Sequence, residues 1–208
     1  MVFVWAISAT ALLTAPAAEA ACGGVERFGP LGSHPAPAPL AVGDSVMMGA
    51  IEPLRRSGFE VDVRGCRQMS EGLRVLRSRL RAGSLPTVVV VALGHNWTIS
   101  PRDIAVALRV LGPERMLGLV TPRGALSSAR HAIRQAGRRW PDRVRVLRWA
   151  ARSRGRPWTW DGLHLTPAGA RAYARLLSQA HSWSLPGGGD RGGAVGPRRR
   201  TVTSVARR

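Results

Sequence analysis

A Gly-Asp-Ser tripeptide at residues 43–45 contains the first side chain that could do chemistry. It follows an apolar run, and apolar residues then recur at helix-face spacing from Val46 to Leu54. Ser45 therefore lies where a short strand turns into a helix, at the edge of a parallel sheet where open α/β proteins bind ligands. A backbone N–H near a helix N-terminus can stabilise an oxyanion there. Alone, the tripeptide is more typical of a turn with a helix N-cap.

A second motif near the far end of the chain contains a candidate base. Asp161 and His164 are three residues apart, just before a helix that Thr166 can cap and Pro167 can begin. Within one turn the carboxylate can fix the imidazole tautomer, which leaves the other ring nitrogen free to take the proton of a serine. An isolated Asp-x-x-His is more often a capping turn with a surface histidine. The serine motif earlier in the chain favours the catalytic interpretation.

Three segments together resemble the SGNH (GDSL-like) hydrolases. Residues 43–45 (Gly-Asp-Ser), 94–96 (Gly-His-Asn) and 161–164 (Asp-Gly-Leu-His) are similar to the first, third and fifth blocks of that family. The resemblance covers residues 39–179. Within the family, the chain looks most like the branch that includes the extracytoplasmic SGNH domains of cell-wall O-acetyltransferases.

The resemblance implies a catalytic triad in which Ser45 is the nucleophile, His164 the general base and Asp161 the residue that orients the base. It also implies an oxyanion hole formed by the backbone N–H of Ser45, the side chain of Asn96 and a glycine N–H after the second strand. Direct alignment places Cys66 at that glycine position, with Gly65 one residue earlier. Either residue can supply an N–H, although a cysteine is strained at the positive φ that glycine adopts freely.

Aromatic residues near these loops favour a carbohydrate substrate, because aromatic faces suit sugar rings. Trp97 and Trp160 are the candidate sugar contacts, whereas Trp149 is expected in the core and packing is the alternative for at least half of these tryptophans. His95 departs from the small residue that usually precedes the asparagine in the family. Its ring could face the substrate or stack against Trp97.

Strand-like and helical patterns alternate along the chain, which predicts a doubly wound α/β layer. We expect strands at residues 40–42, 59–63, 87–93, 115–120 and 144–149, and helices at residues 45–56, 70–81, 101–111, 127–139 and 167–181. The β-branched run at 87–93 is typical of a central parallel strand. The resemblance adds the order 2-1-3-4-5, a three-layer α/β/α fold with a flavodoxin-like, five-stranded parallel sheet.

The two ends of the chain differ in composition from this domain. Residues 1–20 have the apolar segment and small-residue end of a secretory signal peptide, although no Lys or Arg precedes the apolar segment. Residues 21–38 form a Gly/Pro-rich lead-in, residues 39–183 the SGNH hydrolase-like domain, and residues 184–208 a disordered basic tail. We therefore expect a secreted or envelope-associated, extracytoplasmic bacterial protein. In such a protein Cys22 and Cys66 are more often bridged than free.

The net charge and the number of cysteines limit which binding partners and cofactors are expected. The formal net charge of +19 comes from arginine, since no lysine occurs. This charge attracts acidic glycans, anionic lipids and nucleic acids alike, so we expect attraction of the tail to an anionic wall or membrane but no specific nucleic acid. Two cysteines are too few for a zinc cage, and no histidine lies at ligand spacing to either. We expect a monomer without metal or other cofactor.

Three functions remain open. The first is an exported serine esterase that removes small acyl groups, acetyl above all, from carbohydrate or related esters through a Ser45 acyl-enzyme. The second is an O-acyltransferase that uses the same triad on a cell-wall glycan. The third is an inactive SGNH scaffold that serves as a basic glycan- or wall-binding module. The chain contains no multi-span membrane partner to deliver an acyl group, which favours hydrolysis.

Overall fold

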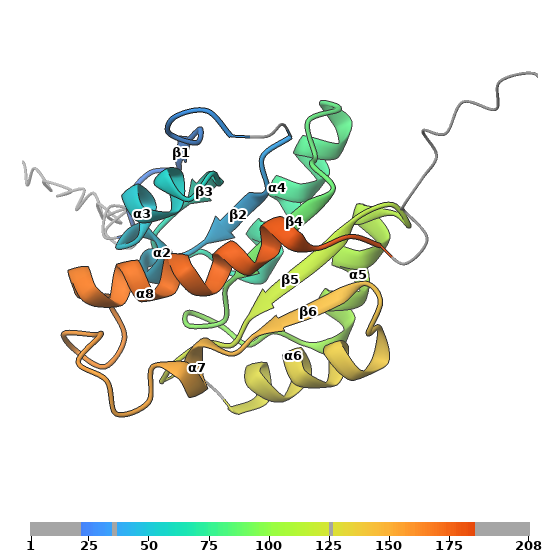
Figure 1. Ribbon diagram of the computed structural model, residues 1–208. Helices are drawn as coiled ribbons and strands as arrows, with labels where there is room; N and C mark the ends of the chain where they lie inside the picture. Colours follow the sequence, from blue (N-terminus) through green and yellow to red (C-terminus); the bar gives the residue numbers. More distant parts are fainter. Residues whose placement is uncertain (1–21, 35–36, 125–126, 186–208) are drawn as a thin grey trace, which may run out of the picture.

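The computed structural model describes residues 22–34, 37–124 and 127–185 (Figure 1). The predicted signal peptide lies outside the described residues, as does all but the start of the predicted basic tail. No helix in the described part of the chain is long and apolar enough to span a membrane.

In the described part of the chain, six strands form one sheet. They are β1 (Glu26–Phe28), β2 (Leu40–Gly43), β3 (Glu60–Val63), β4 (Val88–Ala92), β5 (Met116–Val120) and β6 (Val144–Leu147), in the spatial order β1-β3-β2-β4-β5-β6. The pairs from β3 to β6 are all parallel, so the five predicted strands have the predicted 2-1-3-4-5 order. β1 pairs antiparallel with β3 and was not predicted, because it lies in the Gly/Pro-rich lead-in and is only three residues long.

Helices cover both faces of this sheet. They are α2 (Ser45–Met48), α3 (Ile51–Arg56), α4 (Met69–Arg81), α5 (Pro101–Leu111), α6 (Ser127–Arg139), α7 (Trp149–Arg152) and α8 (Pro167–Leu177), followed by a 3-10 turn, η1 (Ser178–Ser182). Figure 1 shows these helices arranged around the sheet. Buried side chains of α2, α3 and α8 belong to one hydrophobic cluster, and those of α4, α5 and α6 to a second one. The three-layer α/β/α fold is thus confirmed.

The helix predicted at residues 45–56 is in fact two helices. Proline has no N–H to donate to the carbonyl four residues earlier, and its ring clashes with that carbonyl. Pro53 is tolerated only in the first turn of a helix, so the chain breaks at residues 49–50 and α3 begins at Ile51. This break leaves α2 as a single turn behind Ser45.

The fifth strand is shorter than predicted. It ends at Leu147, and Trp149 begins α7 instead of continuing the strand. The Trp149 side chain is fully buried and stacks on Trp158, with 5.7 Å between ring centroids. Its expected place in the core is therefore observed, and this core fixes the start of the loop that leads to Asp161 and His164.

Candidate active site

Three neighbouring strands bring the predicted site residues to one edge of the sheet. Gly43 at the end of β2 lies opposite Val63 of β3 and Ala92 of β4. The strands are parallel, so the segments that follow them, residues 44–45, 64–68 and 93–96, all leave at the carboxyl edge. This is the edge at which ligands bind in open α/β sheets.

Ser45 is the first residue of α2, directly after a tight turn. A Cβ on Gly43 would come within 2.4 Å of the Met47 Cβ, so only glycine lets the helix fold back over the end of β2. Asp44 caps the helix: its Oδ1 accepts a hydrogen bond from the Val46 N–H at 3.1 Å. The Ser45 Oγ lies 3.1 Å from His164 Nε2, although the two residues are 119 positions apart in the chain.

His164 and Asp161 form a hydrogen-bonded turn. The His164 Nδ1 lies 2.7 Å from Asp161 Oδ2, and Asp161 Oδ1 accepts the backbone N–H groups of Leu163 and His164 at 2.9 and 2.8 Å. The side-chain hydrogen bond with His164, followed by the two backbone bonds, holds the pKa of Asp161 well below its usual range. An ionised carboxylate only accepts hydrogen bonds, so Nδ1 carries the proton and Nε2 presents a lone pair to Ser45.

Trp160 fixes the shape of this turn. Its backbone N–H donates to the His164 carbonyl at 3.0 Å, and its indole Nε1 donates to the Leu165 carbonyl at 2.7 Å. The residue nevertheless remains 73% exposed, and Trp97 is 63% exposed. Both candidate sugar contacts therefore present aromatic surface to solvent beside the site.

Two residues of the segment at residues 94–96 contact Asp44. Gly94 adopts a φ of 106°, which turns the chain sharply after β4. The His95 Nδ1 then lies 3.0 Å from Asp44 Oδ2, with only 4% of the His95 side chain exposed. The ring is thus buried against the carboxylate that follows β2 and is not seen to stack on Trp97 among the described residues. A contact between His95 and substrate stays a prediction.

Asn96 lies at the exposed end of the same segment. Its Nδ2 is 3.5 Å from Asp44 Oδ2, a long contact that leaves the amide available to another acceptor. Asp44 thus joins the start of α2 to the segment that contains Asn96. The sequence had indicated this aspartate only as part of a cap.

The segment at residues 64–68 contains the third predicted oxyanion donor. Cys66 forms a disulfide with Cys22, with a Cα–Cα distance of 5.2 Å, and it has a φ of 54°. It is the one non-glycine residue with positive φ among the described residues. Among the described residues, no acceptor forms a hydrogen bond with the backbone N–H of Cys66 or of Ser45. Gly65 is buried against the backbone of Cys22.

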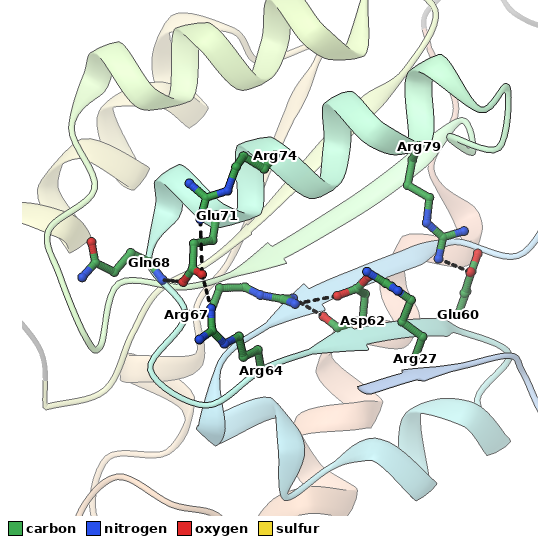
Figure 2. Close-up of polar contacts among 9 residues, drawn as sticks. All are labelled: Arg27, Glu60, Asp62, Arg64, Arg67, Gln68, Glu71, Arg74 and Arg79. Carbon is green, nitrogen blue, oxygen red and sulfur yellow. Dashed lines mark hydrogen bonds and ion pairs between the residues drawn. The ribbon is translucent and has the colours of Figure 1, made fainter. Parts of the chain in front are cut away.

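A buried arginine holds this segment in place. Arg67 is 1% exposed, and its guanidinium donates to the Asp62 carbonyl and to Asp62 Oδ1, both at 2.6 Å. Figure 2 shows Arg67 and Arg27 reaching Asp62 from two sides, and Glu71 contacting Arg64 and the backbone N–H of Gln68. The segment is therefore tied to β3 and to the first turn of α4. Sequence patterns did not reveal Arg67, since its burial depends on the packing of β3 against this loop.

The site shows no arrangement that could hold a metal ion. No group of three or more His, Cys, Asp or Glu side chains has suitable geometry within residues 22–34, 37–124 and 127–185. The chemistry available at this edge is that of a serine, an imidazole, a carboxylate and several N–H donors.

Comparisons with known proteins point to one kind of enzyme. The chain is 29% identical over 147 residues to a putative peptidoglycan O-acetyltransferase, YrhL, of Bacillus subtilis (strain 168). It is 30% identical over 146 residues to the peptidoglycan O-acetyltransferase OatA of Listeria monocytogenes (serovar 1/2a, strain EGD-e). These matches cover 68% and 67% of this chain but only 23% of each relative, so the chain spans under a quarter of their length. No family model matches the chain.

A solved structure has the same fold. The C-terminal catalytic domain of peptidoglycan O-acetyltransferase A from Streptococcus pneumoniae, with a methylsulfonyl adduct, superposes with a TM-score of 0.60 at 20% identity. The match covers 69% of this chain and 91% of that domain. The resemblance of this chain to the SGNH hydrolases, near the SGNH domains of cell-wall O-acetyltransferases, is thus confirmed.

Proposed function

We propose that this chain forms an acyl-enzyme on Ser45 and transfers a small acyl group, acetyl, to a hydroxyl of a cell-wall glycan. The observation that carries the proposal is the hydrogen-bonded chain from Asp161 through His164 to Ser45, at 2.7 and 3.1 Å. The two relatives, one a peptidoglycan O-acetyltransferase and the other a putative one, support transfer better than the simple hydrolysis that the sequence favours.

In the proposed mechanism the triad works in two half-reactions. His164 Nε2 takes the Ser45 proton while Oγ attacks the ester carbonyl, and Asp161 stabilises the imidazolium that forms. The N–H groups of Ser45 and Cys66 and the Asn96 amide stabilise the oxyanion. His164 then protonates the departing alcohol. In the second half-reaction it deprotonates the sugar hydroxyl that attacks the acyl-enzyme, the bond between the acyl group and Ser45 Oγ breaks, and His164 returns the proton to Oγ.

Hydrolysis is the second candidate, because water can reach the site. The His164 and Asp161 side chains are 43% and 54% exposed, so an acyl-enzyme on Ser45 is not sealed from solvent. We expect slow hydrolysis whenever no acceptor is bound. The third alternative, an inactive binding module, is disfavoured because an inert scaffold has no need to keep the serine within hydrogen-bond reach of an oriented imidazole.

The proposal includes an extracytoplasmic location. A disulfide is typical of oxidising compartments, and the Cys22–Cys66 bridge supports export of this chain. Attraction of residues 184–208 to an anionic wall or membrane, and a monomeric state, remain part of the proposal.

Acetyl transfer from p-nitrophenyl acetate, with and without a chito-oligosaccharide acceptor, tests the proposal. Release of p-nitrophenol reports acylation of the serine, and mass spectrometry of the oligosaccharide reports transfer. We expect Ser45→Ala and His164→Ala each to lower turnover about 10³-fold or more. The exposed residues Ser78 and His131 provide matched controls, and Ser78→Ala and His131→Ala should leave turnover unchanged. Turnover that survives in folded Ser45→Ala protein would refute the acyl-enzyme, and p-nitrophenol release without acetylated oligosaccharide would favour hydrolysis.

A further inference from the structure

A cavity lined by arginines lies beside the candidate active site. Its volume is about 410 Å³, within the range of small-molecule sites, and it lies between α6, α7 and the chain that follows β5. Its lining includes five arginines and no aspartate or glutamate: Arg123, Arg130, Arg134, Arg148 and Arg154. We name this cavity the arginine pocket.

The arginine pocket adjoins the turn that contains the candidate base. Gly124 lines the pocket, and a Cβ built on it would lie 3.8 Å from the Gly162 carbonyl oxygen, between Asp161 and His164 in the chain. Thr121 and Ala150, which also line the pocket, are joined by a backbone hydrogen bond of 3.2 Å at the carboxyl edge of the sheet. A glycan bound at Ser45 could therefore extend into the pocket without crossing the molecule.

Most arginines of the pocket form no ion pair with a carboxylate of the described chain, so their charge can attract an anionic ligand. Within residues 22–34, 37–124 and 127–185, no carboxylate forms an ion pair with Arg123, Arg134, Arg148 or Arg154. Arg123 is instead held by a hydrogen bond of 2.9 Å from its Nη1 to the carbonyl of Ser153, a fully buried residue. These four guanidinium groups therefore retain N–H donors for a bound anion.

The guanidinium groups specify the chemistry of the ligand. Arginine presents a planar fork of N–H donors that matches the oxygens of a carboxylate or a phosphate. We propose that the arginine pocket is an acceptor subsite that binds a carboxylate or phosphate group on the glycan that receives the acyl group. The proposal rests on the proposed transfer reaction for the identity of the acceptor, but binding at the pocket requires no catalysis.

Calorimetric titration of the full chain carrying Ser45→Ala tests the pocket without turnover. The probes are three chito-oligosaccharides of equal length: neutral, carboxylated at C6 and phosphorylated at C6. We expect at least one anionic probe to bind about tenfold more tightly than the neutral one in low salt, and this preference to shrink in high salt. The anionic probe that binds more tightly identifies the group that the pocket takes.

Matched variants separate the pocket from the overall positive charge. Arg134→Gln with Arg154→Gln should abolish the preference, whereas Arg77→Gln with Arg109→Gln, which removes the same charge from exposed positions on α4 and α5, should keep it. All four positions are exposed, so melting temperatures should stay close to wild type. If the double pocket variant does not fold, the single Arg154→Gln variant is expected to weaken the preference.

Two outcomes would overturn the subsite. One is equal affinity for neutral and anionic probes, and the other is an equal loss of preference in the pocket and control variants. Failure of the proposed function looks different, because the anionic preference would then persist while no acetylated oligosaccharide forms. Transfer to the neutral oligosaccharide, without any preference for the anionic probes, would support the proposed transferase function but refute the proposed subsite.

Discussion

The Cys22–Cys66 bridge should stabilise both the fold and the segment at residues 64–68, which contains a proposed oxyanion donor. Its reduction is the clearest perturbation of this structure. The bridge closes a loop with a sequence separation of 44 residues. On the chain-entropy model, a loop of that length contributes about 4 kcal/mol to the free energy of unfolding. For a domain of this size each 1 kcal/mol corresponds to about 2–4 °C, so reduction should lower the melting temperature by about 8–16 °C.

Reduction should also lower activity, but by less than the loss of a whole oxyanion donor. Cys66 is held at a φ of 54° beside the buried pair of Arg67 and Asp62. That pair does not depend on the bridge, so the segment should loosen without leaving the site. We expect turnover of p-nitrophenyl acetate to fall by less than the about 10²- to 10³-fold that removal of an oxyanion donor costs.

Melting curves of wild type and Cys22→Ala, each with and without a phosphine reductant, measure how much the bridge contributes to stability. Wild type should shift on reduction, Cys22→Ala should not, and the reduced wild type should melt near the variant. Equal shifts in both proteins, or none in either, would refute the stabilising role of the bridge. Unchanged turnover in reduced, folded wild type would refute the link between the bridge and the proposed oxyanion donor in residues 64–68.

Three further substitutions test parts of the site. Gly65→Ala should lower both melting temperature and turnover, because its Cβ would lie 2.3 Å from the Cys22 carbonyl oxygen and the backbone must move. Arg67→Met should lower the free energy of unfolding in urea by about 3 kcal/mol, the low end for a broken buried ion pair, since a second arginine still reaches the same carboxylate. Asp161→Asn should lower kcat about 10⁴-fold with little change in stability, because His164 loses the acceptor that fixes its tautomer. An Asp161→Asn enzyme with near wild-type kcat would contradict that orienting role.

The parts of the fold that the sequence predicted well depend on local signals. The β-branched run of β4 is fully buried, as its composition indicated. Thr166 caps α8 by accepting the Gly169 N–H at 3.1 Å, and Pro167 follows it as the first helical residue. Such signals involve residues a few positions apart, so they can be recognised without knowledge of the tertiary structure.

The parts that were missed depend on contacts between distant segments. β1 exists as a strand because Glu26, Arg27 and Phe28 pair with β3, and Arg27 also reaches the buried carboxylate of Asp62, 35 residues away. Neither the composition of β1 nor its length indicates that pairing. The arginine pocket is a similar case: its arginines come from separate segments of the chain, from the residues after β5 to those after α7, and only the tertiary fold brings them together.

His95 shows how strand register can set the surroundings of a residue. Its neighbour Asn96 and the family motif placed it near substrate, and nothing local separated a ring that faces solvent from one that faces inward. The pairing of β2 with β4 determines that the ring faces inward. Gly43 lies opposite Ala92, and the His95 Nδ1 then lies 3.0 Å from Asp44 Oδ2. One carboxylate then holds the first turn of α2 through Oδ1 and the segment at residues 94–96 through Oδ2. The proposed nucleophile and the proposed asparagine donor are therefore positioned by the same aspartate, the middle residue of Gly-Asp-Ser.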